Sequence, residues 1–228
     1  MLLVAIGLAT AGCAPVAGSN AGGAHRGVPA RSISRTATTA VDGLARLPVK
    51  GRAPKTGYSR ARFGQAWADT DRDGCDQRNQ VLTRDLTEVR YKQRTHQCVV
   101  LSGQLRDPYT DELIHFRRGA RTSTLVQIDR VVALSDAWQT GAAQLTDDER
   151  ERLATDLLEL VAVSGSANER KRDGDAATWL PPAHDYRCRY VARQVAVKLR
   201  YRLWVTPAEH DAIGRVLSDC PGEPLPAA

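Results

Sequence analysis

The sequence predicts an α+β domain stapled by disulfide bonds, and three observations lead to this fold class. Two short runs rich in apolar and β-branched residues, 126–134 and 160–163, have the length and composition of buried strands. A polar segment, 168–172, follows the second run and is typical of a helix start. Four cysteines and two amphipathic segments lie in the same part of the chain. We therefore expect a strand–strand–helix unit with flanking helices and a β-hairpin.

The first of these strands carries two charged residues, Asp129 and Arg130, inside an apolar run. Burying charge is costly unless the charges are paired or hold a ligand. A functional site therefore competes with two structural explanations, an internal ion pair and a strand end that opens to solvent. The strand pattern alone leaves the three open.

The first 13 residues form an apolar run that ends in small residues before Cys13. This pattern is typical of a bacterial lipoprotein signal, with Cys13 as the lipidated residue. The run is shorter than the roughly 20 apolar residues that a membrane-spanning helix needs. A secretory signal cleaved nearby is the alternative. In both cases we expect export, as a membrane-attached cell-envelope lipoprotein or a secreted protein.

The segment 14–57 is rich in small residues, proline and arginine and has no sustained periodicity, so we expect a disordered basic linker. It holds seven basic residues against Asp42 alone, which leaves 25 basic and 25 acidic residues elsewhere. The net charge of +6 therefore belongs to the linker. Such a segment suits an anionic membrane surface or nucleic acid, or is simply a solvated tether. The folded domain is expected over 58–220, with a C-terminal tail at 221–228.

The other cysteines are Cys75, Cys98, Cys188 and Cys220. In an exported domain, four cysteines favour two disulfides, and three connectivities are open. A zinc site is the competitor, but no Cys-x-x-Cys spacing supports it. We hypothesise the pairs Cys75–Cys98 and Cys188–Cys220, because each closes a local loop of moderate length.

Residues 69–74 have the Asp-x-Asp-x-Asp-Gly spacing of a calcium loop. The twelfth position, where a bidentate glutamate is expected, is Gln80. A calcium site and a structural turn fixed by Cys75 both remain open.

The other elements follow from local patterns. Helices are expected over 58–67, from 135 onward, after the capping boxes 146–149 and 206–209, and over 187–204, and a β-hairpin over 98–103 and 113–116. Candidates for phosphate contacts are the basic face of the 187–204 helix and Arg117, Arg118 and Arg121. A solvated surface is the alternative in each case.

Several ordered blocks resemble the HNH endonuclease family, in its secreted bacterial branch related to the C-terminal nuclease domain of GmrSD-type restriction enzymes. They are 58–60 (YSR), 63–64 (FG), 73–79 (DGCDQRN), 107–110 (DPYT), 127–129 (QID), 168–171 (NERK) and 179–182 (WLPP). The resemblance implies a ββα-metal (HNH-like) core and metal-dependent hydrolysis of phosphodiester bonds in nucleic acid. It also implies a divalent metal, Mg²⁺ or Mn²⁺, as cofactor.

By this resemblance, Asp129 and Asn168 are the expected metal ligands, and Lys171 and Arg78 the expected nucleic-acid contacts. Further cleft candidates are Asp76, Asn79 and His115.

Two positions depart from the family pattern. Arg130 stands where the family has its general-base histidine, and Glu159 stands where it has a supporting asparagine. An arginine is effectively always protonated and cannot accept a proton. Loss of a general base costs on the order of 100- to 10,000-fold in rate. We therefore expect a weakened or inactive site, with Arg130 and Glu159 forming a compensated ion pair.

Three functions follow. The first is a weak HNH nuclease that uses another base, such as His115 or Glu159. The second is a non-catalytic relative that binds nucleic acid or another anion through the same cleft. The third is an envelope lipoprotein that keeps only the stapled scaffold.

Overall fold

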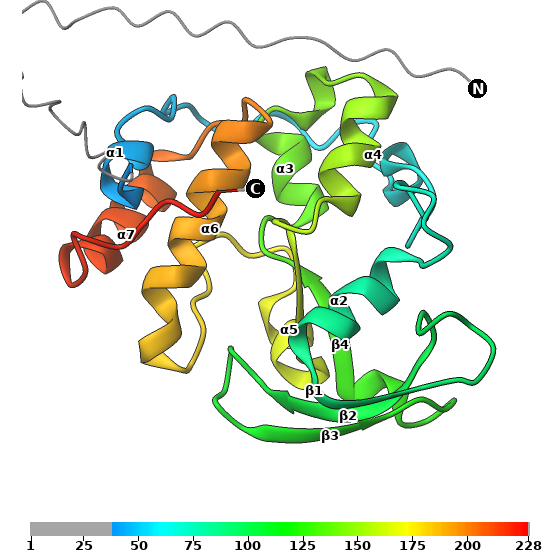
Figure 1. Ribbon diagram of the computed structural model, residues 1–228. Coiled ribbons are helices and arrows are strands. Elements are labelled where there is room, and N and C mark those ends of the chain that lie inside the picture. The colour runs from blue at the N-terminus through cyan, green and yellow to red at the C-terminus, as the bar shows by residue number, and fades with distance from the viewer. Residues whose placement is uncertain (1–37, 228) are drawn as a thin grey trace, which may run out of the picture. The chain divides into compact units, whose positions relative to one another are not determined.

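The computed structural model describes residues 38–227, so the predicted signal with Cys13 and most of the predicted linker lie outside the described residues. Within that range the chain forms seven α-helices and two small antiparallel sheets, an α+β fold (Figure 1). The helices are α1 (Ala40–Leu44), α2 (Gln77–Asp85), α3 (Leu134–Gln139), α4 (Asp147–Thr155), α5 (Gly165–Lys171), α6 (Arg187–Arg200) and α7 (Pro207–Ser218). The strands are β1 (Thr87–Tyr91), β2 (Val100–Arg106), β3 (Leu113–Arg117), β4 (Val126–Arg130) and β5 (Leu160–Ser164).

The predicted strand–strand–helix unit is formed by β4, β5 and α5, which contact one another. The predicted hairpin is formed by β2 and β3, and β1, which local patterns did not predict, pairs with β2 to complete a three-stranded sheet. Helix α2 contacts both β2 and β5 and so joins the two sheets. In Figure 1 the three-stranded sheet lies at the bottom, and α1, α3, α4, α6 and α7 lie above it.

The β4–β5 ribbon has two buried faces because strand side chains alternate in direction. Asp129 pairs with Val161 and Arg130 with Leu160, so these two pairs point to opposite faces. The face of Leu160 belongs to a hydrophobic cluster shared with α2 and the three-stranded sheet. The face of Val161 belongs to the larger cluster shared with α3, α6 and α7. The ribbon therefore lies between two cores, and its charged residues are directed into different surroundings.

The two predicted capping boxes are confirmed. Thr146 accepts the amide of Glu149 at the start of α4, and Thr206 accepts the amide of Glu209 at the start of α7. In both cases the glutamate side chain bonds back to the threonine amide, which satisfies helix N–H groups that otherwise lack a partner.

The helix predicted over 58–67 is only a single 3₁₀ turn, Arg60–Phe63. Gly64 follows at φ 77°, a left-handed conformation that ends the turn and that glycine adopts readily. Phe63 is buried and packs near Tyr58 and Trp138. Trp67, expected on the same helical face, packs against the other cluster.

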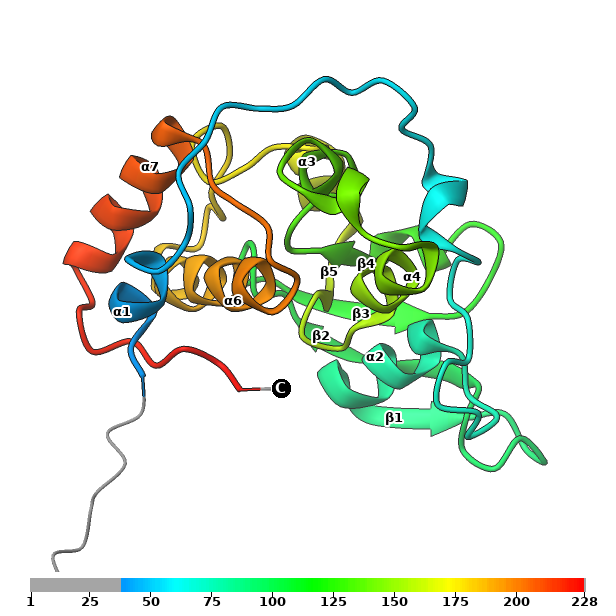
Figure 2. The same ribbon diagram turned by 90° about the horizontal axis from the view of Figure 1, so that it is seen from above.

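The part of the predicted linker that the structure describes, 38–57, is folded onto the domain. Ala40, Leu44 and Leu47 are buried in the larger core, which a disordered segment would not provide. The C-terminal residues lie beside this segment, since the amide of Leu225 donates to the carbonyl of Thr38. Figure 2 shows the segment after α1 crossing the domain toward the first 3₁₀ turn. The ordered chain therefore begins before the predicted boundary at 58.

Both hypothesised disulfides are present. Cys75–Cys98 joins the loop before α2 to the start of β2, with the Cα atoms 5.1 Å apart. Cys188–Cys220 joins the first turn of α6 to the second residue after α7, with the Cα atoms 6.4 Å apart.

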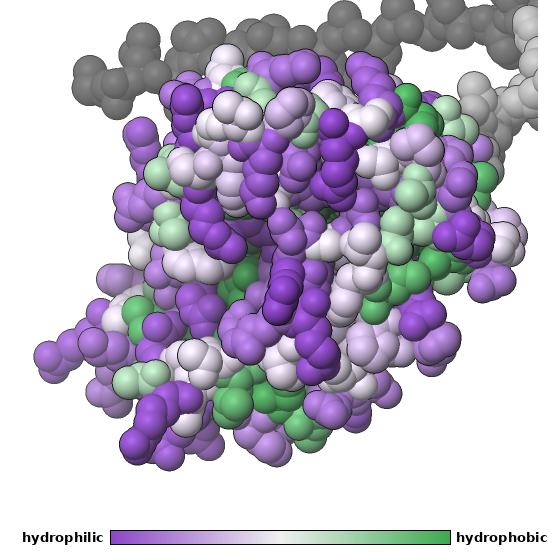
Figure 3. All heavy atoms as spheres, turned by 180° about the vertical axis from the view of Figure 1, so that it is seen from behind, coloured by the Kyte–Doolittle hydropathy of each residue, from purple (hydrophilic) through white to green (hydrophobic). Residues whose placement is uncertain are grey.

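Among residues 38–227, no helix combines the length and the apolar character needed to cross a membrane. On the face shown in Figure 3, hydrophilic residues predominate and hydrophobic residues occur in separate small groups. Scattered groups of this kind are ordinary for a protein surface in water.

Candidate functional site

Asp129 lies on β4 and is buried, with a carboxylate bonded on both oxygens. The ammonium of Lys171, the last residue of α5, lies 3.0 Å from Oδ1 and 2.9 Å from Oδ2. It also donates to the carbonyl oxygen of Arg130 at 2.7 Å. The hydroxyl of Tyr109 donates to Oδ2. Burial, together with the nearby Asp129 charge, raises the pKa of Tyr109 well above its usual range, so this hydroxyl keeps its proton.

Helix α5 is placed close to the 3₁₀ turn Ser123–Leu125, which leads into β4, by its first residue. A Cβ at Gly165 would lie 2.0 Å from the carbonyl oxygen of Thr124, so glycine is required for this approach. Asn168 and Lys171 are one turn apart on the helix and therefore face the same side. The amide of Asn168 donates to Oε1 of Gln127 on β4 at 2.8 Å. The structure thus brings together Asp129, Asn168 and Lys171. Lys171, which was expected to contact nucleic acid, is instead buried against Asp129.

A cavity of about 460 Å³ opens beside Asp129. Its walls come from β4, the start of α3, α5 and the segment 55–60. The basic residues that line it are Lys55, Arg60, Arg130 and Arg172, and the acidic residues are Asp129, Glu169 and Asp173. Since Lys171 neutralises Asp129 from behind, the cavity itself carries an excess of positive charge.

Several of these lining residues were not candidates in the sequence. Arg60 and Gln127 lie in blocks that resemble the HNH family, so the blocks themselves were the available signal. Arg172 follows another such block directly. Lys55 was assigned to the linker, and only the packing of 38–57 places it here, 3.4 Å from Asp173.

Arg130 points away from Asp129. Its Nε donates to the carbonyl oxygen of Ala154 at 3.0 Å, and its guanidinium lies 5.1 Å from the ring centroid of Trp67. Among residues 38–227, Arg130 forms no ion pair with Glu159, so the prediction that these two residues pair was wrong. The reason is strand alternation: the antiparallel register puts Glu159 opposite Val131, on the other face from Arg130.

Glu159 is fully buried and accepts the amide of Val132 through Oε2 at 3.2 Å. Its Oε1 has no hydrogen-bond partner. Burial raises the pKa of Glu159 well above its usual range, with the amide of Val132 and the nearby Lys171 opposing this effect. Glu159 does not line the cavity.

A divalent metal on Asp129 and Asn168, as the family pattern implies, does not fit this arrangement. Metal ligands must offer free oxygen lone pairs. Both oxygens of Asp129 are already bonded to Lys171 and Tyr109. The ammonium of Lys171 sits at the carboxylate where a cation would bind, and like charges at that spacing repel. A metal at Asp129 would have to displace the ammonium of Lys171.

Three predicted cleft residues, Asp76, Arg78 and Asn79, lie in or next to α2. They do not line the cavity and instead hold α2 in place. Arg78 donates to the carbonyl of Val126 at 3.1 Å, and burial lowers the pKa of its guanidinium, with Arg118 adding to this effect. Asp76 caps α2 by accepting the amide of Asn79. Asn79 is buried and accepts from the amide of Val100 and from Arg118. These residues fix α2 to both sheets.

His115, the candidate for an alternative base, lies exposed on β3, opposite Gln104 in the three-stranded sheet. It does not line the cavity. No histidine from the described part of the chain does so.

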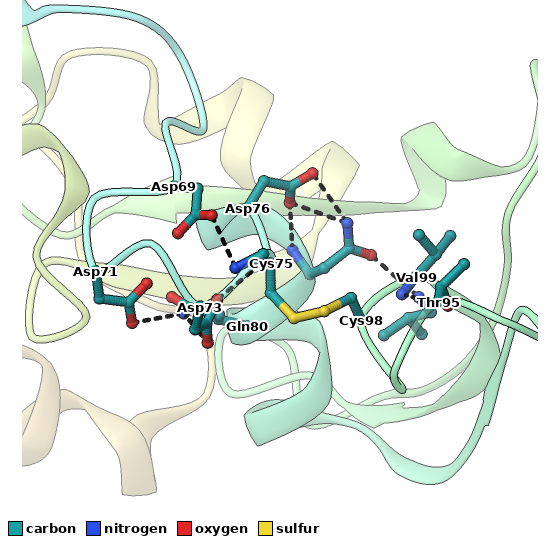
Figure 4. The surroundings of a disulfide bond; sticks show 12 residues. Asp69, Asp71, Asp73, Cys75, Asp76, Gln80, Thr95, Cys98 and Val99 are labelled. Atoms are coloured by element: carbon teal, nitrogen blue, oxygen red, sulfur yellow. Dashed lines mark hydrogen bonds between the residues drawn. A yellow bond between two sulfur atoms is a disulfide. The ribbon is translucent and has the colours of Figure 1, made fainter.

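The acidic loop 69–74 folds so that the carboxylates of Asp69, Asp71 and Asp73 converge at the surface (Figure 4). The side-chain amide of Gln80 donates to Asp71 at 2.9 Å and to Asp73 at 3.0 Å. The loop is joined to β2 by the adjacent disulfide. Both uses considered for it, calcium binding and a fixed turn, stay predictions.

A second buried ionic cluster, which sequence patterns did not reveal, lies between α3, α6 and α7. Lys198 is fully buried and pairs with Asp136 at 3.2 Å and with Glu209 at 2.7 Å. Arg52, from the segment before the cavity, pairs with Asp136 at 2.9 Å and with Asp175 at 2.7 Å. Burial raises the pKa of Glu209 to about 7, with Lys198 opposing this effect. The cluster anchors the segment that delivers Lys55 to the cavity.

The basic face predicted on the 187–204 helix is mostly engaged within the protein. Arg193 donates to the carbonyls of Leu157 and Leu160 at 2.8 Å each, and Arg200 pairs with Asp156 at 2.7 Å. With Lys198 buried as well, little of this face is left to contact phosphate.

The fold contains a small strand–strand–helix unit and a β-hairpin. The unit has an aspartate on its first strand and an asparagine on its helix, which is the arrangement of an HNH-type nuclease domain. Residues 76–216 match the family of GmrSD restriction endonucleases, C-terminal domain. The chain is also 36% identical over 197 residues to an uncharacterized secreted protein of Arthroderma benhamiae, covering 85% of this chain and 90% of that relative. No solved structure matches. The protein belongs to the GmrSD C-terminal domain family.

Proposed function

We propose that this protein is an exported member of the family that binds the phosphodiester backbone of nucleic acid in the cavity beside Asp129 and hydrolyses it weakly or not at all. The observation that carries this proposal is the buried pair of Asp129 and Lys171. It places a fixed positive charge where the family pattern expects a metal.

The absence of a base supports the same conclusion. Hydrolysis needs a group that accepts a proton from water, and Arg130 cannot do so near neutral pH. Glu159 is fully buried and lies away from the cavity. No other carboxylate or imidazole of residues 38–227 stands in the base position on β4.

Anion binding is supported by the charges of the cavity. Arg60 and Arg172 are exposed, and neither forms an ion pair with an acidic residue of the described chain. Guanidinium groups recognise phosphate well because their N–H donors match its oxygens. The side-chain amides of Gln127 and Asn168 add polar groups to the wall.

Export is supported by the signal predicted over 1–13 and by the two disulfides, which are typical of oxidising compartments. The fungal relative is named a secreted protein. Attachment to the membrane through a lipid on Cys13 is part of the proposal.

The test combines a cleavage assay and a binding assay on the purified full chain. With Mg²⁺ or Mn²⁺ added, we expect supercoiled plasmid to stay intact, and we expect DNA retention that weakens with salt, because phosphate contacts release counterions. Arg60→Ala with Arg172→Ala should weaken retention. A matched control is Arg46→Ala with Arg215→Ala, two exposed arginines outside the cavity.

Rapid metal-dependent nicking by the wild-type chain would contradict the weakening or loss of hydrolysis. Absence of both nicking and retention would contradict nucleic-acid binding and leave the scaffold role. Equal weakening by the cavity pair and the control pair would show that the cavity is not the binding site.

A further inference from the structure

One row of the three-stranded sheet carries two arginines on its outer strands. Arg90 on β1 is opposite Ser102 on β2, which is opposite Arg117 on β3. Both arginines are exposed. Neighbouring strands lie about 4.8 Å apart, so the backbones of the two arginines are roughly 10 Å apart with a small residue between them. Long basic side chains on either side of a small one leave room for an extended ligand.

The chain around this row is uniformly basic. The segments 89–102 and 116–122 hold six basic residues and no acidic one, whereas residues 58–228 are balanced overall. We call these two segments the basic end; its basic residues are Arg90, Lys92, Arg94, Arg117, Arg118 and Arg121.

Arg118 is engaged with the protein, donating to the carbonyl of Val100 and to Asn79. The other five basic residues form no ion pair with an acidic side chain of residues 38–227. The acidic loop 69–74 is connected to the basic end by the Cys75–Cys98 disulfide. Its carboxylates accept hydrogen bonds from backbone amides of the loop and its neighbour Cys75 and from the side chain of Gln80. Five side chains are therefore available to an external anion.

The basic end is connected to the cavity. Residues 117–122 line a surface hollow of about 540 Å³ and lead through the 3₁₀ turn Ser123–Leu125 into β4. That turn packs on α5 at Gly165, and α5 forms part of the cavity wall. Five residues of β4 span roughly 16 Å. The hollow and the far end of the cavity are thus separated by about one strand length, more than a single nucleotide spans.

We propose that the basic end is a second contact for the phosphodiester backbone, so that the ligand is a polynucleotide that reaches from the cavity to Arg117 and Arg90. This inference rests on the proposed function. A backbone with several charges pairs with both basic surfaces, whereas a short oligomer in the cavity reaches one of them.

The test measures binding of two fluorescent thymidine oligomers, about 20 and about 4 nucleotides long, to the full chain at several salt concentrations. Arg90→Ala, Arg117→Ala and Arg121→Ala are combined in one variant. We expect it to bind the long oligomer roughly tenfold more weakly and to lower its log–log salt slope by about 2, because about 0.7 is lost per phosphate contact on a single strand. Binding of the short oligomer should stay within about twofold.

The matched control combines Arg46→Ala, Arg189→Ala and Arg215→Ala, three exposed arginines near α1, α6 and α7 with the same change in net charge. If this control weakens the long oligomer as much as the test variant does, net charge explains the effect and the inference is overturned. If the basic-end variant binds the long oligomer like wild type, the inference fails while the proposed function stands. If wild type binds neither oligomer, the proposed function itself fails.

Discussion

The ammonium group of Lys171 lies 2.9 Å from Oδ2 of Asp129, and both side chains are buried where α5 meets β4. The side chain of Lys171 is fully buried and that of Asp129 is 7% exposed, so each charge depends on the other for compensation. The pair has two consequences. It holds the helix of the strand–strand–helix unit on its first strand, and it removes the free carboxylate that a metal would need.

Lys171→Met should therefore destabilise the protein by about 3–5 kcal/mol, because it leaves the charge of Asp129 buried and unpaired. Urea unfolding at neutral pH measures this. Arg172→Met, the next residue and exposed, is the matched control and should change the free energy of unfolding by less than about 0.5 kcal/mol.

Adding Asp129→Asn to Lys171→Met should recover part of the lost stability, since no unpaired charge then remains. Equal stability of Lys171→Met and wild type would mean that the pair is not formed in solution.

Restoring a histidine at the base position should not by itself restore hydrolysis. Arg130→His supplies a group with a pKa near ~6.5. We nevertheless expect plasmid nicking with Mn²⁺ to stay within about tenfold of wild type, because Lys171 still occupies the carboxylate of Asp129. A general base alone contributes about 100-fold or more in an intact site. Recovery on that scale from the single change would show that Asp129 is free to bind metal.

Glu159→Asn added to Arg130→His should act independently of it, since the two side chains form no ion pair and point to opposite faces. A double-mutant cycle in unfolding free energy should give a coupling below about 0.5 kcal/mol. A coupling several times larger would indicate that the two side chains meet in solution.

Local patterns were sufficient for the elements of the site. The β4 and β5 strands, the α5 helix, the capping box at Thr146 and both disulfides depend on residues close in sequence or on short loops. These features were predicted because propensity, capping and loop closure act locally.

The direction of the charged side chains was not predictable in the same way. Lys171 ends a polar stretch whose sequence predicts an exposed helix start. It is buried only because α5 approaches the rest of the domain closely at Gly165. Arg130 was expected to pair with Glu159, but the side of the β4–β5 ribbon to which each side chain points depends on the exact pairing register of the two strands. Likewise, the segment 38–57 has no periodicity, so its order comes from tertiary contacts such as those of Arg52.

The ionic cluster around Glu209 should make stability depend on pH. The folded pKa is about 7, above the unfolded value of 4.5. A carboxyl with a raised folded pKa contributes stability that is fully present below 4.5 and is lost as pH rises toward 7. The difference in unfolding free energy between wild type and Glu209→Gln should therefore shift against wild type across that range, by up to about 3 kcal/mol. Denaturant unfolding at a series of pH values measures this, and a difference that is constant from pH 4.5 to 7.5 would contradict it.

The segment 38–57 should be necessary for a stable domain. A chain that begins at Tyr58 loses Leu44 and Leu47 from the core, each worth about 1.5–3 kcal/mol of burial. It also loses Arg52, which leaves Asp136 and Asp175 without that partner in a buried cluster. Against a total stability of about 5–15 kcal/mol, we expect this chain to be mostly unfolded or to melt far below one that begins at residue 38.

Thermal unfolding of the two chains, followed by circular dichroism, compares them directly. Arg52→Met in the longer chain isolates the ionic part of the effect. It should cost less than the truncation, because Arg52 is about one third exposed and its pairs are partly screened by water. If the chain beginning at Tyr58 melts at the same temperature as the longer one, then residues 38–57 are a tether and contribute nothing to the core.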